Sequence, residues 1–463
     1  MSEKGFRTEK DSMGEMQVPA DALYGPQTQR AVENFPISSL RVPRSMIKGL
    51  GIIKASAASV NSSLGLLDKD KADFIIKAAA EVEEGQHDSQ FVVDIFQTGS
   101  GTSSNMNTNE VVARRATQLS GEEVRVHPND HVNMSQSSND VFPTSIHIAS
   151  AIEVNENLLP SLKVLADSLA KKAEEFKDIV KTGRTHLMDA TPIMLGQEFS
   201  GYEAQIRFGI ERIERALSSV YELPQGGTAV GTGLNAHQDF APKVAAEIAS
   251  RTGLPFVEAR NHFEAQGAKD AFVELSGALR TVAVSFSKVA NDIRWLASGP
   301  RCGFQEISIP AVQPGSSIMP GKVNPVISES VIMACAQVIG NDQTVAVSGL
   351  YGSNFELNVM MPVLAHNILE SISLLSATSV NFANKCVDGI AANEERIHEL
   401  AEASIASCTA LAPIIGYDKT AALAKEAFNT GKSFREVALE HQVMPEAELD
   451  KALDLKKMTK PDA

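Results

Sequence analysis

The sequence predicts an all-α protein built around a central bundle of long helices, and three observations carry this prediction. Large apolar residues recur in alternating steps of three and four from Phe272 to Leu296, which is a heptad seam. Small residues such as Ala278 and Ala290 flank the seam, and aromatic residues make up only 5% of the chain, so neighbouring helices can pack closely. No alternation of strand and helix patterns occurs, which excludes a doubly wound sheet.

The expected helices are bounded by residues that interrupt helical patterns, chiefly Gly, Pro and Asp. Residues 1–45 read as an irregular stretch that Pro19, Gly25 and Pro26 interrupt. Helical patterns follow, separated by Gly and Asp, and short amphipathic patterns occupy the chain after residue 390. The expected helices are 45–63, 68–84 and 105–119, followed by the long helices of the bundle at 158–179, 196–223, 272–296, 325–348 and 356–386.

These patterns predict three domains. A mixed loop and helical domain spans 1–137, the long-helix bundle spans 138–390, and a small helical domain spans 391–463. A helix as long and apolar as 272–296 rarely completes its burial inside one chain. We therefore expect the bundle to form the core of a symmetric oligomer.

Charge and cysteine content exclude several classes of function. The chain has 57 acidic and 42 basic residues, a net charge of −15, which argues against a nucleic-acid partner. No continuous apolar run approaches the ~20 residues that a membrane helix needs, so no membrane partner is expected. None of the four cysteines forms a CxxC pair, and the N-terminus has no apolar leader. These features favour a reducing compartment, the cytoplasm.

Four polar, glycine-rich segments interrupt the helical patterns, and they are the candidates for chemistry. They are Thr98–Asn107, His127–Asp140, Gly183–Pro192 and Gly315–Pro325. Three of them run into an expected helix start, where unpaired backbone N–H groups favour anions. Because Ser, Thr and Asn predominate there, with Lys322 in the last segment, the segments suit small carboxylates. No segment has the spacing of metal ligands or the pattern of a nucleotide-binding loop.

Each candidate also has a purely structural interpretation. Ser, Asn and Asp before a helix are often only caps, and Asn324 followed by Pro325 reads as such a cap. A single histidine such as His186 is more often structural than catalytic. Glu329, early in its helix, would ordinarily be a surface acid. The glycines and prolines around two serines and Lys322 favour a functional loop.

The segments together resemble a known family. GSSIMPGKVNP is similar to the signature loop of the fumarase/aspartase superfamily, and QTGSGTSSNMN, HPND, SQSSND, GRTH and GTGLN are similar to segments of the class II fumarate hydratases. The resemblance runs from about residue 6 to about residue 450. His186, His127 and Gly321 favour the hydratases over aspartate ammonia-lyases, whereas His131 is the residue more typical of the ammonia-lyases.

The resemblance implies a lyase of the tricarboxylic acid cycle that hydrates fumarate reversibly to L-malate through a carbanion, without cofactor or metal. It also implies a homotetramer whose active sites each use residues from three chains. Two alternatives stay open: an aspartate ammonia-lyase, and a catalytically silent helical oligomer on the same scaffold. The intact set of Ser316, Lys322, His186 and Glu329 argues against the silent oligomer.

The resemblance assigns a role to each matching residue. Ser316 would be the base that removes the C3 proton, and His186, backed by Glu329, would act on the hydroxyl through a water. Lys322 and Asn324 would hold a substrate carboxylate. The remaining substrate-binding residues would be Ser100, Thr102, Ser137, Ser138, Asn139, Thr185 and Ser317, and a second anion site would comprise His127, Asn129 and Asp130.

A serine hydroxyl is too weak a base unless its alkoxide is stabilised. We expect that the helix N-terminus at Pro325 and the charge of Lys322 provide this stabilisation when the loop closes. The site must bind the doubly negative intermediate more tightly than the substrate, because only such differential binding accelerates the reaction.

Overall fold

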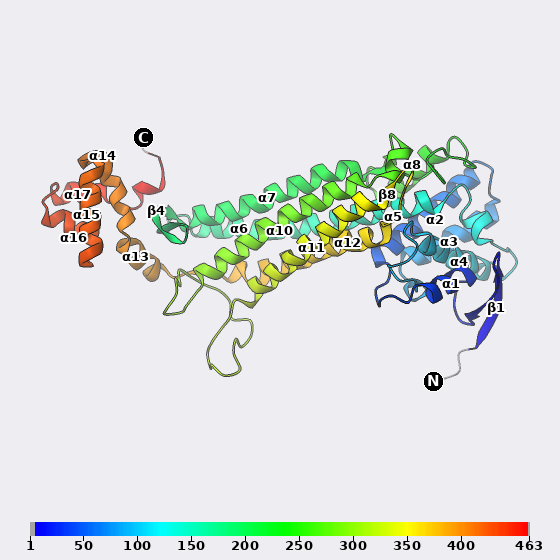
Figure 1. Cartoon of the computed structure of the whole chain (residues 1–463), viewed down its shortest axis with the longest axis horizontal. Coiled ribbons are helices and arrows are strands. Elements are labelled where there is room, and N and C mark those ends of the chain that lie inside the picture. Colours follow the sequence, from blue (N-terminus) through cyan, green and yellow to red (C-terminus); the bar gives the residue numbers. More distant parts are fainter. Residues whose placement is uncertain (1–4, 462–463) are drawn as a thin grey trace. The chain divides into compact units, whose positions relative to one another are not determined.

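A computed structural model describes residues 5–461, and it is mainly helical (Figure 1). Within these residues every sheet has only two strands. The predicted all-α class is therefore confirmed.

The chain forms two compact units, which are described separately. Unit 1 comprises Met1–Pro160, Gly209–Ala283 and Cys335–Ser376, and unit 2 comprises Ser161–Phe208, Val284–Ala334 and Ala377–Ala463. Five helices contribute residues to both units: α6 (Leu159–Glu175), α7 (Leu195–Val220), α10 (Asp270–Leu296), α11 (Val326–Gly352) and α12 (Met361–Lys385). The division into three domains at 137/138 and 390/391 stays a prediction.

Unit 1 contains the N-terminal helices and most of the short strands. Its helices are α1 (Pro26–Asn34), α2 (Arg44–Ser63), α3 (Lys69–Glu83), α4 (Thr102–Leu119), α5 (Ser138–Glu153), α8 (Phe240–Thr252) and α9 (His262–Gly267), with the short turns η1 (Asp88–Gln90), η2 (Pro128–Val132) and η3 (Val154–Leu158). Its strands are β1 (Phe6–Asp11), β2 (Gly14–Pro19), β5 (Glu222–Leu223), β6 (Val257–Glu258), β8 (Ser353–Asn354) and β9 (Leu357–Asn358).

Three expectations for unit 1 were wrong. Residues 6–19 form the antiparallel hairpin β1–β2, not an irregular stretch, and Gly14 with φ 118° allows the tight turn. The last long helix begins at Met361, not at residue 356, because the β8–β9 hairpin uses the backbone of residues 353–358. Helix α4 begins at Thr102, three residues before the expected start.

Unit 2 contains α6 and the C-terminal helices. Its elements are α6 (Leu159–Glu175, from Ser161 onward), β3 (Val180–Thr185), β4 (Met188–Met194), β7 (Ile307–Ser308), η4 (Val387–Gly389), β10 (Ala391–Ala392), α13 (Glu394–Ala403), η5 (Ile405–Leu411), α14 (Ala412–Ile415), α15 (Tyr417–Thr430), α16 (Phe434–Glu440), α17 (Glu446–Ala452) and η6 (Lys457–Thr459). Helices α15–α17 and η5 bury a small apolar core that includes Leu423, Phe434 and Leu449.

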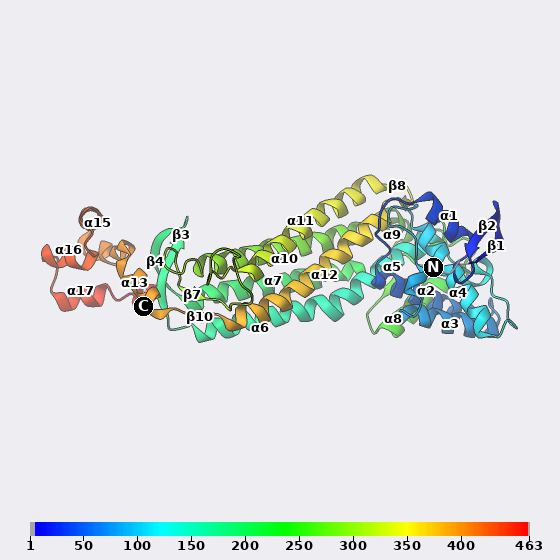
Figure 2. The ribbon, with the colours of Figure 1, turned by 90° about the horizontal axis from the view of Figure 1, so that it is seen from below.

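The long helices pack as a bundle within each unit. In unit 2 their segments run side by side (Figure 1, Figure 2), and Phe286 of α10 contacts Phe382 of α12 with ring centroids 5.4 Å apart. In unit 1, Arg280 of α10 donates to Asp342 of α11 at 2.8 Å. The heptad seam of α10 is buried along its whole length: Phe272, Leu275, Leu279, Val282, Phe286, Val289, Ile293 and Leu296.

This burial changes the argument for an oligomer. The seam is already covered within one chain, so it does not by itself require a partner. Exposed apolar side chains occur on several elements, and α11 carries a group of them, with Val347 44%, Leu350 69% and Tyr351 71% exposed. Helix α11 is apolar around its circumference, which is typical of a helix that is buried on every side.

Helix α12 is the one helix among residues 5–461 that is long and apolar enough to cross a membrane by length and composition. Half of its most apolar window is buried inside the structure, as in the core helix of a globular protein. Polar residues such as Asn367 and Glu370 interrupt α12, so it contains no continuous apolar run of ~20 residues, and its length and composition alone are weak evidence for a membrane span.

Candidate active site

In unit 1, the first and second polar segments meet at two helix N-termini. The Ser100 and Thr102 hydroxyl oxygens lie 2.8 Å apart, and the Thr102 and Ser138 oxygens lie 2.7 Å apart. Gly101 caps α4 with φ 74°, and a Cβ there would lie 2.1 Å from the Phe142 ring. Only glycine therefore allows this approach of α4 to α5, which joins three of the predicted substrate-binding residues.

The other two predicted substrate-binding residues of unit 1, Ser137 and Asn139, lie at the start of α5. The Ser137 side chain accepts the Asn139 backbone N–H at 3.2 Å, and Asp140 completes a capping box by accepting the Ser137 N–H at 2.9 Å. The Asn139 amide donates to the Ala229 carbonyl at 2.8 Å. The predicted cap is thus present, but Ser138 also takes part in the hydroxyl chain.

Asp140 ties this site to a third segment that sequence reasoning did not place. Its other carboxylate oxygen accepts the N–H groups of Gly226 and Thr228 at 3.0 and 2.9 Å. Asp140 is fully buried, and burial raises its pKa to about 6 against the lowering effect of these hydrogen bonds. The density of glycine in QGGTAVGTG, residues 225–233, was the available signal for this loop.

The predicted second anion site lies on a single exposed turn. His127, Asn129 and Asp130 belong to η2 and the residue before it, and the Asp130 N–H donates to His127 Nδ1 at 3.1 Å. The His127 N–H in turn donates to His131 Nδ1 at 2.8 Å. Burial, with the nearby Lys71, lowers the pKa of His131, so this histidine tends to be neutral.

In unit 2, Thr185 and His186 lie at the tip of the β3–β4 hairpin. His186 and Leu187 form its two-residue turn with φ 57° and 61°, a conformation that residues other than glycine rarely adopt. Strand β3 is anchored to the buried Glu306 near both of its ends, because Arg184, next to the tip, donates to Glu306 at 2.8 Å and the buried Lys181, near the base, lies 3.5 Å from it. The His186 imidazole is therefore exposed on a firmly anchored support.

The fourth segment forms a closed loop before α11. The Gly315 N–H donates to the Lys322 carbonyl at 2.9 Å, and the Asn324 side chain donates to the Gly315 carbonyl at 2.6 Å. A Cβ on Gly315 would lie 2.5 Å from the Lys322 carbonyl oxygen, so glycine is required. The expectation that Asn324 caps the helix was wrong, since its side chain closes the loop instead.

Within this loop, the Ser316 hydroxyl oxygen accepts two backbone N–H groups. They come from Ile318 at 3.2 Å and Met319 at 2.9 Å. Both would stabilise a negative charge on that oxygen. The sequence led us to expect that Lys322 and the helix N-terminus at Pro325 would stabilise the Ser316 alkoxide. It did not predict the backbone donors Ile318 and Met319.

The remaining predicted catalytic side chains are exposed and unpartnered. Among residues 5–461, the side chains of His186, Lys322 and Glu329 make no hydrogen bond or ion pair, and Ser317 is exposed beside Ser316. The hydrogen bond expected between His186 and Glu329 is not made within the single chain. These groups are available to other molecules.

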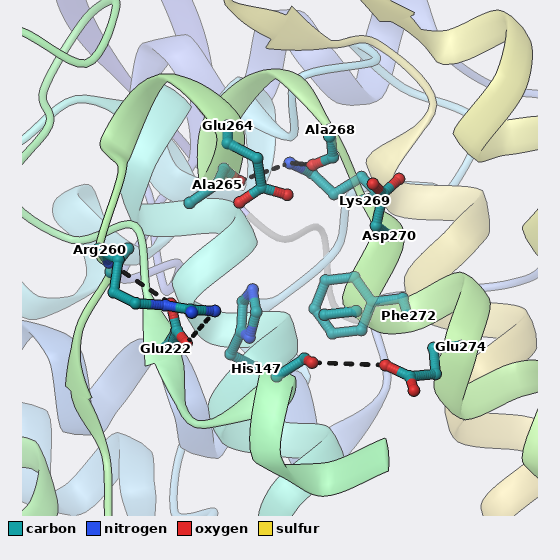
Figure 3. Close-up of a pocket in the computed structure, with 13 residues that line it drawn as sticks. His147, Glu222, Arg260, Glu264, Ala265, Ala268, Lys269, Asp270, Phe272 and Glu274 are labelled. Carbon is teal, nitrogen blue, oxygen red and sulfur yellow. Dashed lines mark hydrogen bonds and ion pairs between the residues drawn. The ribbon is translucent and has the colours of Figure 1, made fainter.

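A separate cavity of about 280 Å³ in unit 1 contains none of the predicted site residues (Figure 3). His147 and Phe272 line it with ring centroids 4.5 Å apart, and His147 Nδ1 lies 2.7 Å from the Val220 carbonyl. Lys269 lines it too, and its ammonium donates to the carbonyls of Ala265, Gln266 and Ala268. Both polar residues are thus bound to backbone carbonyls.

His147 makes the folded state sensitive to acid. Burial lowers the pKa of His147 to about 4, whereas an unfolded histidine titrates near 6.5. Between these values the unfolded state binds the proton and the folded state does not, so the free energy of unfolding falls as the pH falls. Replacement by glutamine should remove up to ~1.4 kcal/mol of this loss per pH unit, which urea unfolding from pH 7 to pH 4 would measure. If the replacement leaves the dependence of the unfolding free energy on pH unchanged, His147 is not the source of the acid sensitivity.

The described residues contain no cluster of three or more His, Cys, Asp or Glu side chains that could hold a metal ion, and their four cysteines are free. The predicted substrate-binding residues of unit 1 carry hydroxyls and amides, and the predicted residues of unit 2 also include His186, Lys322 and Glu329. Such a donor set suits a small dicarboxylate.

Comparisons with known proteins agree with this chemistry. The model of a lyase family matches residues 14–340, and a model of the fumarase C C-terminus matches residues 408–460. The chain therefore belongs to this family of lyases.

Relatives that match almost the whole chain define the group within the family. The class II fumarate hydratase of Corynebacterium glutamicum is 54% identical over 461 residues, with 98% of this chain and 97% of the relative covered. That of Neisseria meningitidis is 52% identical over 448 residues, covering 96% and 97%. A crystal structure of class II fumarase from Schistosoma mansoni superposes with a TM-score of 0.97 at 39% identity and covers 99% and 100% of the two chains. This chain is a member of the class II fumarate hydratases.

Proposed function

We propose that the chain catalyses the reversible hydration of fumarate to L-malate by acid–base catalysis, as its family membership supports. In the malate direction, a base removes a proton from C3. The electron pair left behind spreads onto the adjacent carboxylate and forms a doubly negative aci-carboxylate. The C2 hydroxyl then accepts a proton and leaves as water, and the C2–C3 double bond forms.

The observation that carries this mechanism is the pair of N–H groups on the Ser316 oxygen. Ile318 and Met319 donate to it at 3.2 and 2.9 Å, so they lower the cost of forming an alkoxide. The Lys322 ammonium, which has no partner among residues 5–461, can add a full charge. Such a charge is worth ~4 kcal/mol at ~4 Å for an effective dielectric near 20.

We propose that His186 acts on the opposite side of the substrate. An imidazole gives and takes a proton near neutral pH, and the hairpin tip exposes this one to solvent. A water between the imidazole and the C2 hydroxyl would carry the proton, with Glu329 hydrogen-bonded behind the ring. The carboxylates would be held by Lys322 and Asn324 together with Ser100, Thr102, Ser137, Ser138, Asn139, Thr185 and Ser317.

The active unit we propose is a homotetramer in which each site uses residues from three chains. The exposed apolar side chains of α11 support a helix packed against other copies, because monomers rarely leave a large contiguous apolar surface in water. The unpartnered side chains of His186, Lys322 and Glu329 support a site that one chain leaves incomplete. The resemblance of the loop and hairpin to the family supports the same assembly.

Two minor assignments go with this proposal. His127, Asn129 and Asp130 would form a second anion site on the exposed η2 turn, as the resemblance of HPND to the family supports. We also propose a cytoplasmic enzyme with a small dicarboxylate substrate, without a nucleic-acid or membrane partner, in keeping with the net charge of −15.

Loss of the ultraviolet absorbance of fumarate tests the function directly. The purified protein should consume fumarate rapidly without ammonium and yield L-malate. Loss only when ammonium is added would instead identify an aspartate ammonia-lyase, the alternative that His131 raises. No loss under either condition would favour a silent helical oligomer.

A further inference from the structure

Lys54, in the middle of α2, is completely buried next to the candidate site. Its ammonium donates to three side-chain oxygens: Asn105 Oδ1 at 2.8 Å, Asn133 Oδ1 at 3.0 Å and Gln136 Oε1 at 3.1 Å. No carboxylate among residues 5–461 forms an ion pair with it. Asp140 is the charged group that acts on it at longer range. Burying an ammonium group that has only neutral oxygen partners costs folding free energy. Such a residue at this position suggests a function that outweighs the loss of stability.

The three oxygens belong to the two segments that carry the predicted substrate-binding residues of unit 1. Asn105 lies in the first turn of α4, three residues after Thr102. Gln136 immediately precedes Ser137, the cap of α5. Asn133 joins the two sides, because its Oδ1 also accepts from Asn105 and its side-chain amide donates to the Gln136 carbonyl. Lys54 therefore bonds directly to both segments.

Only a lysine can make this junction with one side chain. Its ammonium provides three donors on a single atom and accepts none, so three oxygens can converge on one point. An apolar side chain of similar length would fill the volume but leave these oxygens without a donor in a dry interior. The segments would then move apart to reach other donors, and the Thr102–Ser138 contact would be lost.

We propose that Lys54 is a positioning residue for the dicarboxylate site, holding Ser100 and Thr102 in register with Ser137–Asn139. This inference rests on the proposed assignment of those residues to substrate binding. The lysine does not touch the substrate and acts through Asn105, Asn133 and Gln136. Burial lowers the pKa of Lys54 to about 7, and the Asp140 carboxylate partly opposes this effect.

Lys269 provides a matched control. It is also a buried lysine of unit 1 with three oxygen acceptors, and burial likewise lowers its pKa to about 7. Its acceptors, however, are the backbone carbonyls of Ala265, Gln266 and Ala268. Replacing either lysine by methionine should lower the melting temperature, whereas only Lys54→Met should disturb the two substrate-binding segments.

The test compares Lys54→Met with Lys269→Met in steady-state fumarate hydration and in succinate binding by calorimetry. For Lys54→Met we expect KM and the succinate Kd to rise about tenfold while kcat changes less than about threefold, because lost uniform binding raises KM alone. Lys269→Met should leave both constants within about twofold of the wild type. If Lys54→Met lowers the melting temperature without changing KM or Kd, Lys54 is only structural and the proposal fails.

Two further variants complete the design. If Lys54→Met does not fold, Gln136→Leu removes one of the three acceptors and should raise KM about threefold in the same direction. An unchanged KM in that variant would overturn the proposal. Asn139→Ala tests the site assignment separately. If Asn139→Ala leaves KM unchanged while Lys54→Met raises it, Asn139 is not a binding residue and the positioning role stands.

Discussion

Replacing Ser316 by alanine is expected to lower kcat about 10²–10⁴-fold in both directions, with little change in KM, because a positioned base contributes about that much. The serine oxygen is the atom toward which the Ile318 and Met319 N–H groups point, at 3.2 and 2.9 Å. Alanine removes the oxygen and leaves the loop's closing bonds, from Gly315 to Lys322 and from Asn324 to Gly315, intact. Initial rates of fumarate loss and of malate dehydration would measure the change.

Ser330→Ala is the matched control for this prediction. Ser330 is an exposed serine in the first turns of α11, close in sequence to the loop but outside the proposed site. Its replacement should leave kcat and KM unchanged. Turnover near the wild-type rate in Ser316→Ala would show that another group removes the C3 proton.

Replacing Leu350 by glutamate is expected to dissociate the oligomer and to lower activity at least about a hundredfold, because groups that must be held in register are then separated. Leu350 is 69% exposed in the single chain, so the substitution places a charge on the surface of a monomer at little cost to its fold. In an interface the same charge would be buried without a partner. Sedimentation velocity and fumarate hydration, measured on the same sample, would test both parts.

Ile414→Glu serves as the control. Ile414 is 61% exposed on the short helix α14, away from α11 in the sequence, and its replacement should preserve assembly and activity. A Leu350→Glu monomer with wild-type activity would refute the shared active site.

Mixing two impaired variants tests whether each active site takes residues from different chains. Ser316→Ala lies in unit 2 and Asn139→Ala in unit 1, and each should abolish or weaken every site of its own homotetramer. If a site takes Ser316 and Asn139 from different chains, unfolding and refolding the two variants together should create some intact sites. No recovery in the mixture would mean that both residues come from the same chain.

Much of the fold was predictable because helix periodicity is a local property. The apolar spacing from Phe272 to Leu296 predicted α10 almost to the residue, and the expected range 45–63 differs from α2 by one residue. The hairpins were not predicted. The β3–β4 turn uses His186 and Leu187 instead of the Asn-Gly or Gly residues that identify such turns in a sequence, and β1–β2 alternates exposed and half-buried residues without a strong apolar face.

The candidate site, like the fold, has features that the sequence predicts and features that only the structure shows. The sequence determined which segments are polar, which residues could bind a dicarboxylate, and the family that these motifs resemble, because residue type and spacing are encoded locally. Only the tertiary structure decided that Thr102 contacts Ser138 across 36 residues, that Asn324 closes a loop instead of capping a helix, and that Lys54 bonds to both sides of the site. The contacts of Thr102 and Lys54 depend on how α2, α4 and α5 pack against one another, and the closure by Asn324 depends on the path of the loop before α11. No periodicity in a single segment records either.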